Sequence, residues 1–307
     1  MVAVREGTGR MNHIFYHGAD LDGICSAAIA LHTTAIGRSP CNLHACDYGK
    51  PFPWYNISQG DHGIMLDFSL SPADMYRLDR ALSSFVWIDH HKSAIESVRR
   101  YMEETPHSGY PLKGLREIGR AGCELTWDYF HVDVPVPYVV RMLGRYDVFD
   151  HRDPDIRPFQ YGCRLDSADP SDAIWKRRLS AESTDELSVR ILGNGRIIES
   201  WERRENARKL AGRGFATVLG GMKVLACNET GGSLLFEDIP SHLSGDYAAY
   251  LTFVYSSDRK QWVYGLYGVP GKDIDLSEFA ARYGGGGHAR AAGFHHEHEI
   301  ATEGRIH

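Results

Sequence analysis

The feature of this sequence that most constrains its fold is the run FVWIDHH at residues 85–91. Its first four residues are aromatic or β-branched and are bounded by polar sequence, which predicts a buried β-strand. The run then ends in Asp89, His90 and His91. Ligands bind at the carboxyl ends of the strands in open α/β sheets. A carboxylate and two imidazoles at such an end therefore predict chemistry rather than packing.

Similar apolar runs precede it, and they predict further strands at residues 13–16, 43–48 and 63–69. The last of these also contains an acid, Asp67. Helical spacing of apolar residues predicts helices between the strands, at 24–35 and at 72–82. Strands that alternate with helices predict a mostly parallel sheet.

The next part of the chain predicts a helical cover. Helices are expected from residue 121 and from about residue 137, and the second carries Asp147 near its core-facing side. Residues 150–172 are rich in Asp, Pro and Arg, which predicts a loop-rich segment. Residues 185–211 are dense in charge with an apolar seam, which predicts a connecting helix. Gly193 and Gly195 are its expected weak points.

From residue 213 the pattern changes to strands with one short helix. The strands are expected at 215–219, 222–228, 248–255, 261–269 and 291–296, and the helix at 275–283. The predicted fold class is thus α/β: an N-terminal, mostly parallel sheet flanked by helices, a helical linker, and a smaller α/β C-terminal domain with a mixed sheet. The expected boundaries are 1–190, 191–212 and 213–307.

Composition limits the function. The chain has 307 residues and a formal charge of −6, from 34 basic and 40 acidic side chains. A net acidic chain is unsuited to binding long duplex nucleic acid through its charge. The six cysteines form no CxxC pair and are expected to be reduced thiols. No apolar run approaches the roughly 20 residues of a membrane span, and no signal peptide is apparent. A cytoplasmic location without membrane contact is expected.

Eight polar residues share a position at the end of a predicted buried element. They are His17, Asp20, Asp22, Asp67, Asp89, His90, His91 and Asp147. Any single acid is explained as a cap or turn former, but four segments that aim acids or imidazoles at one sheet edge are not. Carboxylates with a few imidazoles suit Mn²⁺ or Mg²⁺, and the lack of thiolates disfavours structural zinc. The ligand count suffices for two ions, with Asp67 as the expected bridge.

These residues resemble a known family. HxxDxDG at 17–23, the strand-end Asp67, DHH at 89–91 and RYD at 145–147 look like the four successive motifs of the DHH phosphoesterase superfamily. GGGGHARAAGF at 284–294 resembles the glycine-rich motif of its DHHA1 C-terminal domain. In size and layout the chain is similar to the small two-domain branch: nanoRNases, 3′-phosphoadenosine 5′-phosphate phosphatases and dinucleotide phosphodiesterases. RecJ-type exonucleases share the motifs but are usually longer.

The resemblance implies a role for each residue of the edge. One ion would be held by His17, Asp20 and Asp67, and the other by Asp22, Asp67, His90 and Asp147. Mn²⁺ is the expected metal, with Mg²⁺ as the alternative. His91 would face the substrate phosphate, and Asp89 would orient a neighbouring histidine. The first motif is one residue shorter than in several relatives, so His17 is the ligand that this difference affects most.

The glycine run implies a substrate-binding segment. Glycines let the backbone approach a ligand and expose N–H groups to phosphate oxygens. The residues expected to bind substrate are Gly285, Gly286, Gly287, His288 and Arg290. The simpler explanation is a turn before an edge strand.

The function implied by the resemblance is a metal-dependent phosphoesterase. In it, a water activated by two metals would attack phosphorus in a short oligonucleotide or small nucleotide, while the C-terminal domain closes over the cleft. An inorganic pyrophosphatase or exopolyphosphatase of the same superfamily is the first alternative. A non-catalytic nucleotide-sensing module is the second. A homodimer is a further expectation from two-domain relatives, although no feature of the sequence requires it.

Overall fold

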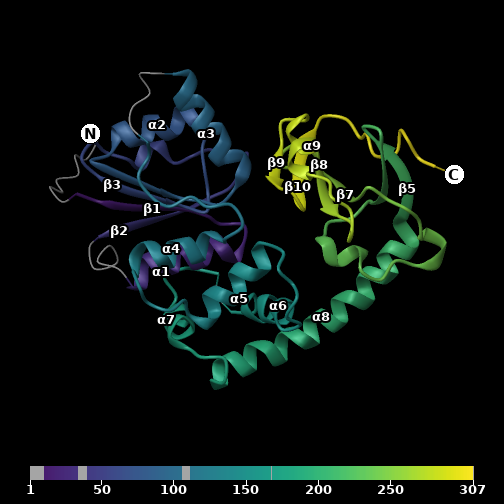
Figure 1. The fold of residues 1–307 in the computed structure, drawn as a ribbon, viewed down its shortest axis with the longest axis horizontal. Helices are drawn as coiled ribbons and strands as arrows, with labels where there is room; N and C mark the ends of the chain where they lie inside the picture. Colours follow the sequence, from purple (N-terminus) through teal and green to yellow (C-terminus); the bar gives the residue numbers. More distant parts are fainter. Residues whose placement is uncertain (1–9, 34–39, 106–110, 167, 307) are drawn as a thin grey trace, which may run out of the picture. The chain divides into compact units, whose positions relative to one another are not determined.

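In the computed structural model the described residues are 10–33, 40–105, 111–166 and 168–306. The chain divides into two compact units, residues 1–196 and residues 197–307. One long helix, α8 (Glu186–Arg213), contains the point of division (Figure 1). Each unit is described here by itself.

The first unit is built on a four-stranded sheet. Its strands are β1 (Asn12–His17), β2 (Cys41–Cys46), β3 (His62–Leu66) and β4 (Ser84–Ile88), in the order β2-β1-β3-β4. All three pairings are parallel, so the predicted parallel sheet is confirmed. The central position of β3 places the residue after it, Asp67, between the ends of β1 and β4.

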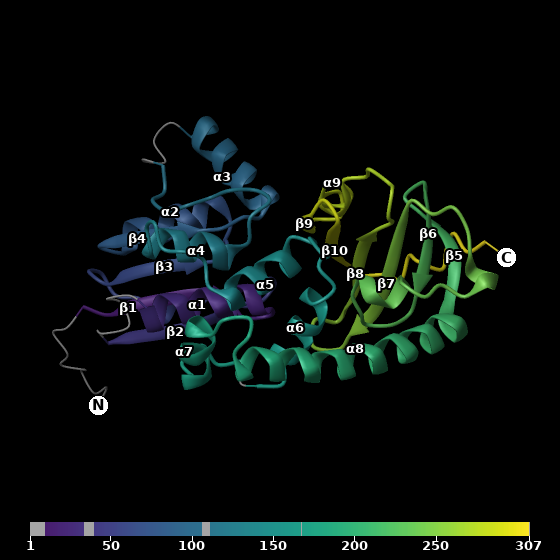
Figure 2. The same ribbon diagram turned by 60° about the horizontal axis from the view of Figure 1, so that its bottom comes forward.

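Helices cover both faces of this sheet. In Figure 1 α1 (Leu21–Thr33) and α4 (Gly122–Phe130) lie on one face, while α2 (Pro72–Ala81) and α3 (Lys92–Glu104) lie on the other; Figure 2 gives a second view of the same unit. Alternate residues of each strand face opposite sides. Ile14 and Ile64 therefore belong to the core under α1, and Phe15 and Met65 to the core under α2.

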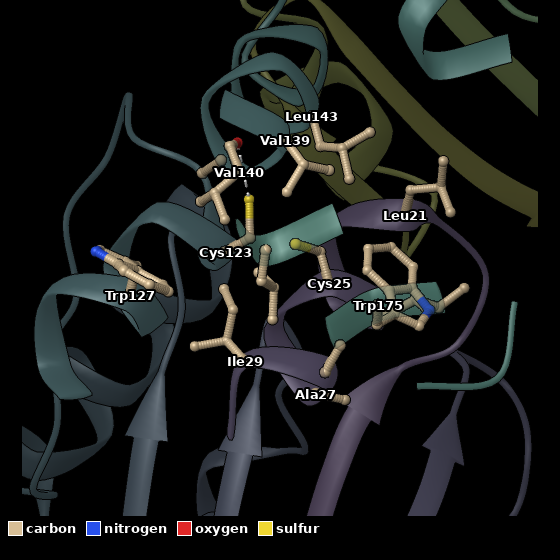
Figure 3. Packing of buried hydrophobic residues seen from close by; sticks show 14 of the residues in the cluster. Leu21, Cys25, Ala27, Ile29, Cys123, Trp127, Val139, Val140, Leu143 and Trp175 are labelled. Atoms are coloured by element: carbon tan, nitrogen blue, oxygen red, sulfur yellow. Dashed lines mark hydrogen bonds between the residues drawn. The ribbon is translucent and has the colours of Figure 1, made fainter. Parts of the chain in front are cut away.

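The core under α1 also includes residues of α5 (Tyr138–Asp147) and α7 (Ala173–Ser180). Figure 3 shows Cys25 and Ile29 of α1 close to Cys123 of α4 and Val140 of α5. Because α5 packs in this core, its last residue, Asp147, belongs to the same unit as the sheet. The predicted role of α5 as the carrier of Asp147 is thus met in the structure.

The prediction of a loop-rich segment at residues 150–172 is wrong over the middle of that segment. Helix α6 spans Ile156–Cys163. Ile156, Phe159 and Cys163 are buried at helical spacing, a signal that the dense charge and Pro158 conceal. Pro158 falls in the first turn, where a helix tolerates proline.

Helix α8 is continuous through Gly193 and Gly195. A Cβ on Gly195 would lie 1.7 Å from the carbonyl oxygen of Pro158, and one on Gly162 would lie 2.0 Å from that of Ile191. Helices α6 and α8 therefore approach so closely that only hydrogen fits between their backbones. Gly195 thus serves helix packing rather than flexibility.

The second unit is built on a six-stranded mixed sheet. Its strands are β5 (Gly214–Leu219), β6 (Met222–Cys227), β7 (Ala249–Ser256), β8 (Gln261–Gly268), β9 (Gly286–His288) and β10 (Ala291–His296), in the order β5-β6-β7-β8-β10-β9. Among these described strands, only the pair β6–β7 is parallel. Helix α9 (Leu276–Ala281) begins at Asp275, whose side chain accepts from the backbone N–H of Ser277. The predicted fold class is confirmed.

Short 3₁₀ helices lie at η2 (Trp54–Asn56), η3 (Ser233–Phe236) and η4 (Ser241–Leu243). Of the helices in the described ranges, none combines the length and the apolarity needed to span a bilayer.

Candidate metal centre

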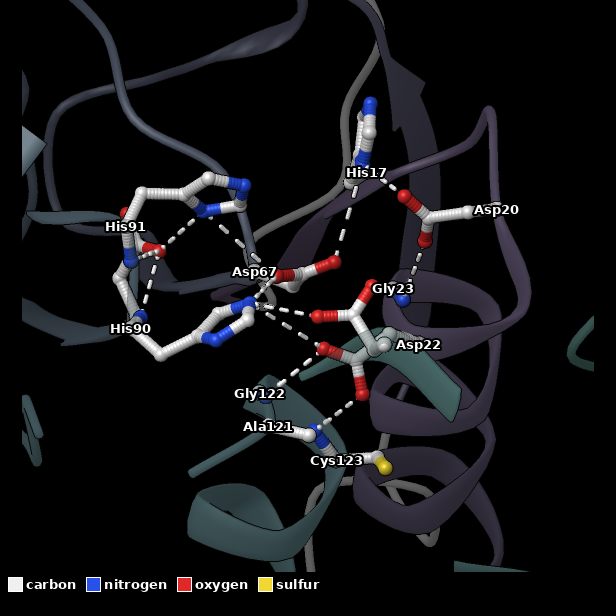
Figure 4. Close-up of polar contacts among 12 residues, drawn as sticks. His17, Asp20, Asp22, Gly23, Asp67, His90, His91, Ala121, Gly122 and Cys123 are labelled. Carbon is white, nitrogen blue, oxygen red and sulfur yellow. Dashed lines mark hydrogen bonds and ion pairs between the residues drawn. The ribbon is translucent and has the colours of Figure 1, made fainter. Parts of the chain in front are cut away.

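Asp67 is the centre of the polar cluster at the carboxyl edge of the first sheet. It follows β3 directly and has φ +52°, a conformation that non-glycine residues rarely adopt. Only 1% of its surface is exposed. Its backbone N–H donates to the carbonyl of Ile88, so the ladder with β4 fixes its position. The carboxylate lies between two imidazoles: Oδ1 is 3.1 Å from Nε2 of His90, and Oδ2 is 3.7 Å from Nδ1 of His17 (Figure 4).

On one side of Asp67 lie His17 and Asp20. Nδ1 of His17 is 2.7 Å from Oδ2 of Asp20. The other oxygen of Asp20 accepts the backbone N–H of Gly23, which ties the carboxylate to the first turn of α1. Ligand atoms of His17, Asp20 and Asp67 all lie within 4.8 Å of one another. The short loop between His17 and Asp20 therefore does not remove the imidazole from the cluster.

On the other side His90 meets two more carboxylates. Its Nε2 is 3.2 Å from Oδ2 of Asp147 and 3.6 Å from Oδ2 of Asp22. Asp22 has a second set of contacts, because its oxygens accept the backbone N–H groups of Gly122 (2.7 Å) and Cys123 (2.8 Å). These N–H groups belong to the first turn of α4, where an acid is favourable.

Asp89 faces His91 rather than the metal-side histidine. Its Oδ1 is 2.8 Å from Nδ1 of His91 and accepts the backbone N–H groups of His90 (2.7 Å) and His91 (3.1 Å). Its Oδ2 accepts from the indole N–H of Trp87 (3.2 Å). The backbone of Asp89 also forms an isolated parallel β-bridge with that of Arg116. The carboxylate therefore holds both the backbone turn and the ring of His91.

The charges of the cluster oppose one another. Burial raises the pKa of Asp22, and the carboxylates of Asp67 and Asp147 raise it further. Burial likewise raises the pKa of Asp147 to about 7, although His90 opposes the shift. Three carboxylates at this spacing, of which Asp22 and Asp67 are buried, repel one another, and a proton or a cation must relieve the repulsion.

The imidazoles now carry that compensating charge. Burial alone would lower the pKa of His17 and of His90, but the carboxylates around each ring outweigh it and raise both pKa values to about 11. The same contacts lower the pKa of Asp67 against the effect of its burial. A divalent cation would replace the protons of both rings. Oxygen donors with imidazole nitrogens and no thiolate suit Mn²⁺ or Mg²⁺, so the residues present fit such ions.

The structure thus brings all eight predicted edge residues together. Two groups of potential ligands share Asp67: His17 with Asp20, and Asp22 with His90. A third group joins Asp67, Asp89 and His91. Asp147 completes the second through His90.

The glycine segment lies in the second unit and has packing roles of its own. Gly284, at φ +74°, ends the turn after α9. A Cβ on Gly285 would lie 2.1 Å from the carbonyl oxygen of Gly293, and Gly286 begins the edge strand β9. Arg290 donates to the carbonyl oxygens of Lys272 (2.9 Å) and Val269 (3.4 Å). Substrate binding by these residues stays a prediction.

Sequence reasoning misses three residues of this edge. The apolar pattern puts Tyr48 inside a strand at 43–48, but β2 ends at Cys46 and Tyr48 stands in a turn. The following Gly49 is the signal that marks the turn. Gly122 and Cys123 hold Asp22 through their backbone, and no side-chain pattern predicts that contact.

Comparisons with known proteins place the fold. No protein-family model matches the chain. An uncharacterised protein of Acanthamoeba polyphaga mimivirus is 24% identical over 300 residues, which cover 91% of this chain and 66% of that protein. The chain therefore spans slightly less than two thirds of the length of this curated relative.

Among solved structures, the DHH domain of a protein from a ribosomal-protein family is similar at a TM-score of 0.53 and 14% identity, over 94% of this chain and 83% of that chain. A pGpG-specific phosphodiesterase from Vibrio cholerae has a TM-score of 0.46 and 10% identity, over 94% and 93%. The first similarity shows that this chain has the fold of a DHH protein. The resemblance predicted from the motifs is confirmed at the level of the fold.

Proposed function

We propose that this protein is a divalent-metal-dependent phosphoesterase that hydrolyses ester bonds of short oligonucleotides or small nucleotides. The observation that carries the proposal is the position of Asp67, a buried carboxylate shared by two groups of potential metal ligands. A carboxylate between two ions is the arrangement of two-metal hydrolytic sites.

The metal ligands follow from the two groups. His17, Asp20 and Asp67 would hold one ion, and Asp22, Asp67, His90 and Asp147 the other. When bound, such ions supply Lewis acidity and lower the pKa of coordinated water. Mn²⁺ is the proposed metal, because the donors mix carboxylate and imidazole.

His91 is the proposed contact with the substrate phosphate. Burial lowers its pKa, but Asp89 and Asp67 outweigh burial and raise the pKa above its ordinary value. Its side chain keeps 14% of its surface exposed, in contrast to the buried His90. An imidazolium held by Asp89 donates to a phosphoryl oxygen and stabilises the charge that develops there. The leaving oxygen then departs toward solvent.

The proposal also assigns a role to each part of the chain. Residues 1–190 catalyse, residues 191–212 link, and residues 213–307 bind substrate through Gly285, Gly286, Gly287, His288 and Arg290. The formal charge of −6 favours a short substrate over a long nucleic acid.

The test is hydrolysis by the full chain in Mn²⁺ with a panel of pNpN dinucleotides, 3′-phosphoadenosine 5′-phosphate, cyclic dinucleotides and pyrophosphate. The wild type is expected to hydrolyse at least one nucleotide, and His90→Asn to lose roughly 10³-fold or more in kcat/KM. His62→Asn is the matched control, because His62 contacts Ser84 at the opposite edge of the sheet. Retained turnover in His90→Asn contradicts the proposal. Turnover of pyrophosphate alone favours the pyrophosphatase alternative, and nucleotide binding without any turnover favours the sensing module.

A further inference from the structure

Three of the four strands of the first sheet end at polar residues of the metal centre, and the fourth, β2, ends shortly before an aromatic residue, Tyr48. Strand β2 pairs in parallel with β1, and its last residue, Cys46, is opposite His17. The chain then turns over residues 47–50, where the N–H of Lys50 donates to the carbonyl of Asp47. Gly49 has φ +80°, as the third residue of a type II turn requires. Tyr48 is the second residue of this turn, at the same sheet edge as the metal centre.

The ring of Tyr48 lies beside the imidazoles of His17 and His91. Its centroid is 5.7 Å from that of His17 and 6.4 Å from that of His91. Phe68, which is buried, supports the ring at 4.7 Å. The turn and the supporting ring therefore hold Tyr48 in place without a ligand.

The Tyr48 side chain is only partly covered by the protein, since 40% of the residue surface is exposed. A residue that only filled the core would not leave this much aromatic surface open beside a cluster of charges.

An exposed, supported aromatic ring next to a phosphate-binding histidine suits a nucleotide, whose base stands one sugar away from its phosphate. Bases stack on aromatic side chains with little dependence on sequence. We propose that Tyr48 stacks against one nucleobase of the substrate and thereby makes the site selective for nucleotides over phosphates that lack a base. This inference rests on the proposed function of the same site, and it names the substrate class.

The test compares a dinucleotide with its two abasic counterparts, in which either the 5′ or the 3′ base is replaced by hydrogen. The full chain is assayed in Mn²⁺ as wild type, Tyr48→Phe and Tyr48→Leu. In Tyr48→Leu the ratio of kcat/KM for the dinucleotide to that for one abasic counterpart is expected to fall by about 10-fold or more, mainly through KM. Tyr48→Phe keeps the ring and is expected to retain this ratio within about 2-fold.

Tyr55→Leu is the matched control, because Tyr55 is 88% exposed in the nearby η2. It is expected to match the wild type on every substrate. Equal losses on the dinucleotide and on both abasic counterparts in Tyr48→Leu overturn the inference, since they show that Tyr48 only positions the neighbouring imidazoles.

A second measurement does not depend on turnover. A dinucleotide analogue with a methylene-bridged phosphonate and 2-aminopurine as the base is titrated into each variant. Its fluorescence is expected to be quenched by wild type and Tyr48→Phe and to be quenched less by Tyr48→Leu. Equal quenching by all variants overturns the inference. If the wild type hydrolyses no phosphoester, the proposed function fails, while this titration still decides whether Tyr48 stacks on a base.

Discussion

Aspartate and histidine side chains gather at both ends of strands β1 and β3, but the pKa values of the aspartates are shifted in opposite directions at the two ends. At the amino end, Nε2 of His13 lies 3.0 Å from Oδ2 of Asp61, and Nδ1 lies 2.9 Å from Nε2 of His44. Asp61 also accepts the backbone N–H groups of Met11 and Ser58. This end thus has one carboxylate for two imidazoles, and the contacts of Asp61 outweigh its burial and lower its pKa.

At the carboxyl end the ratio is reversed, with more carboxylates than imidazoles in the cluster. There the pKa values of Asp22 and Asp147 are raised, because burial and like charges both act against ionisation. The comparison teaches that histidine beside aspartate is not in itself a sign of chemistry. An excess of buried negative charge is the sign, because protons or bound cations must balance it.

The largest expected difference between the two ends is in activity. Asp67→Asn removes the shared carboxylate and is expected to lower kcat/KM in Mn²⁺ by about 10³-fold or more. Asparagine tolerates positive φ and removes a repulsive charge, so the melting temperature is not expected to fall. Asp61→Asn is expected to keep the activity of the folded protein. A loss of activity in Asp61→Asn as large as that in Asp67→Asn would contradict the expected difference between the two ends.

The next effect is metal-dependent stability. Mn²⁺ at about 100 times its Kd is expected to stabilise the wild type by about 2.7 kcal/mol, measured as a shift in thermal unfolding. Asp67→Asn is expected to lose this shift, and Asp61→Asn is expected to retain it. An equal shift in all three proteins would place the metal elsewhere.

A smaller effect is expected from the amino end alone. Asp61→Ala leaves a buried imidazole and two backbone N–H groups without their acceptor, and it is expected to cost about 2–3 kcal/mol of the free energy of unfolding. Urea denaturation without metal measures this loss. Asp74→Ala is the control, because Asp74 is an exposed acid that contacts Ser71 and Arg77. A loss in Asp61→Ala no larger than in the control would show that the chain of contacts through His13 contributes little.

The smallest effect concerns pH. Burial and, to a smaller extent, the neighbouring His13 lower the pKa of His44 to about 4. Between pH 4 and pH 6.5 the unfolded chain binds a proton at this ring that the folded chain does not, so stability falls as the pH falls through this window. His44→Gln keeps a donor near His13 but does not titrate. Its loss of stability from about pH 6.5 to about pH 4.5 is expected to be smaller than that of the wild type by about 1 kcal/mol. Equal slopes in the two proteins would contradict this.

The contrast between the two ends also explains which parts of the structure can be predicted from the sequence. Asp67 and Asp89 are predictable, because an apolar run that stops at an acid marks a strand end, and the ends of parallel strands meet. Asp147 is predictable from helical spacing. The pair of His13 and Asp61 is not, because their contact depends on a 48-residue separation and on the register of neighbouring strands. Helix α6 is missed for a different reason: its charges and Pro158 hide a buried stripe.

The remaining gaps are backbone contacts. From the sequence alone, Gly195 is expected to be a flexible point of the helix. The structure shows that a side chain there would collide with the backbone of α6. Gly122 is similar, since a Cβ there would lie 2.8 Å from Cβ of Asp67. Such contacts have no periodicity, so pattern analysis does not detect them.

The two sets of contacts made by Asp22 bear on how related sequences are compared. Its oxygens serve the first turn of α4 as well as the candidate metal centre. A descendant of this chain that abandoned catalysis would still be selected to keep Asp22 for the sake of its architecture. The contacts that join the side chains of Asp67 and His90 lie within the cluster itself. Their loss or retention, and not that of Asp22, would distinguish a working hydrolase from a relative that has only inherited the shape.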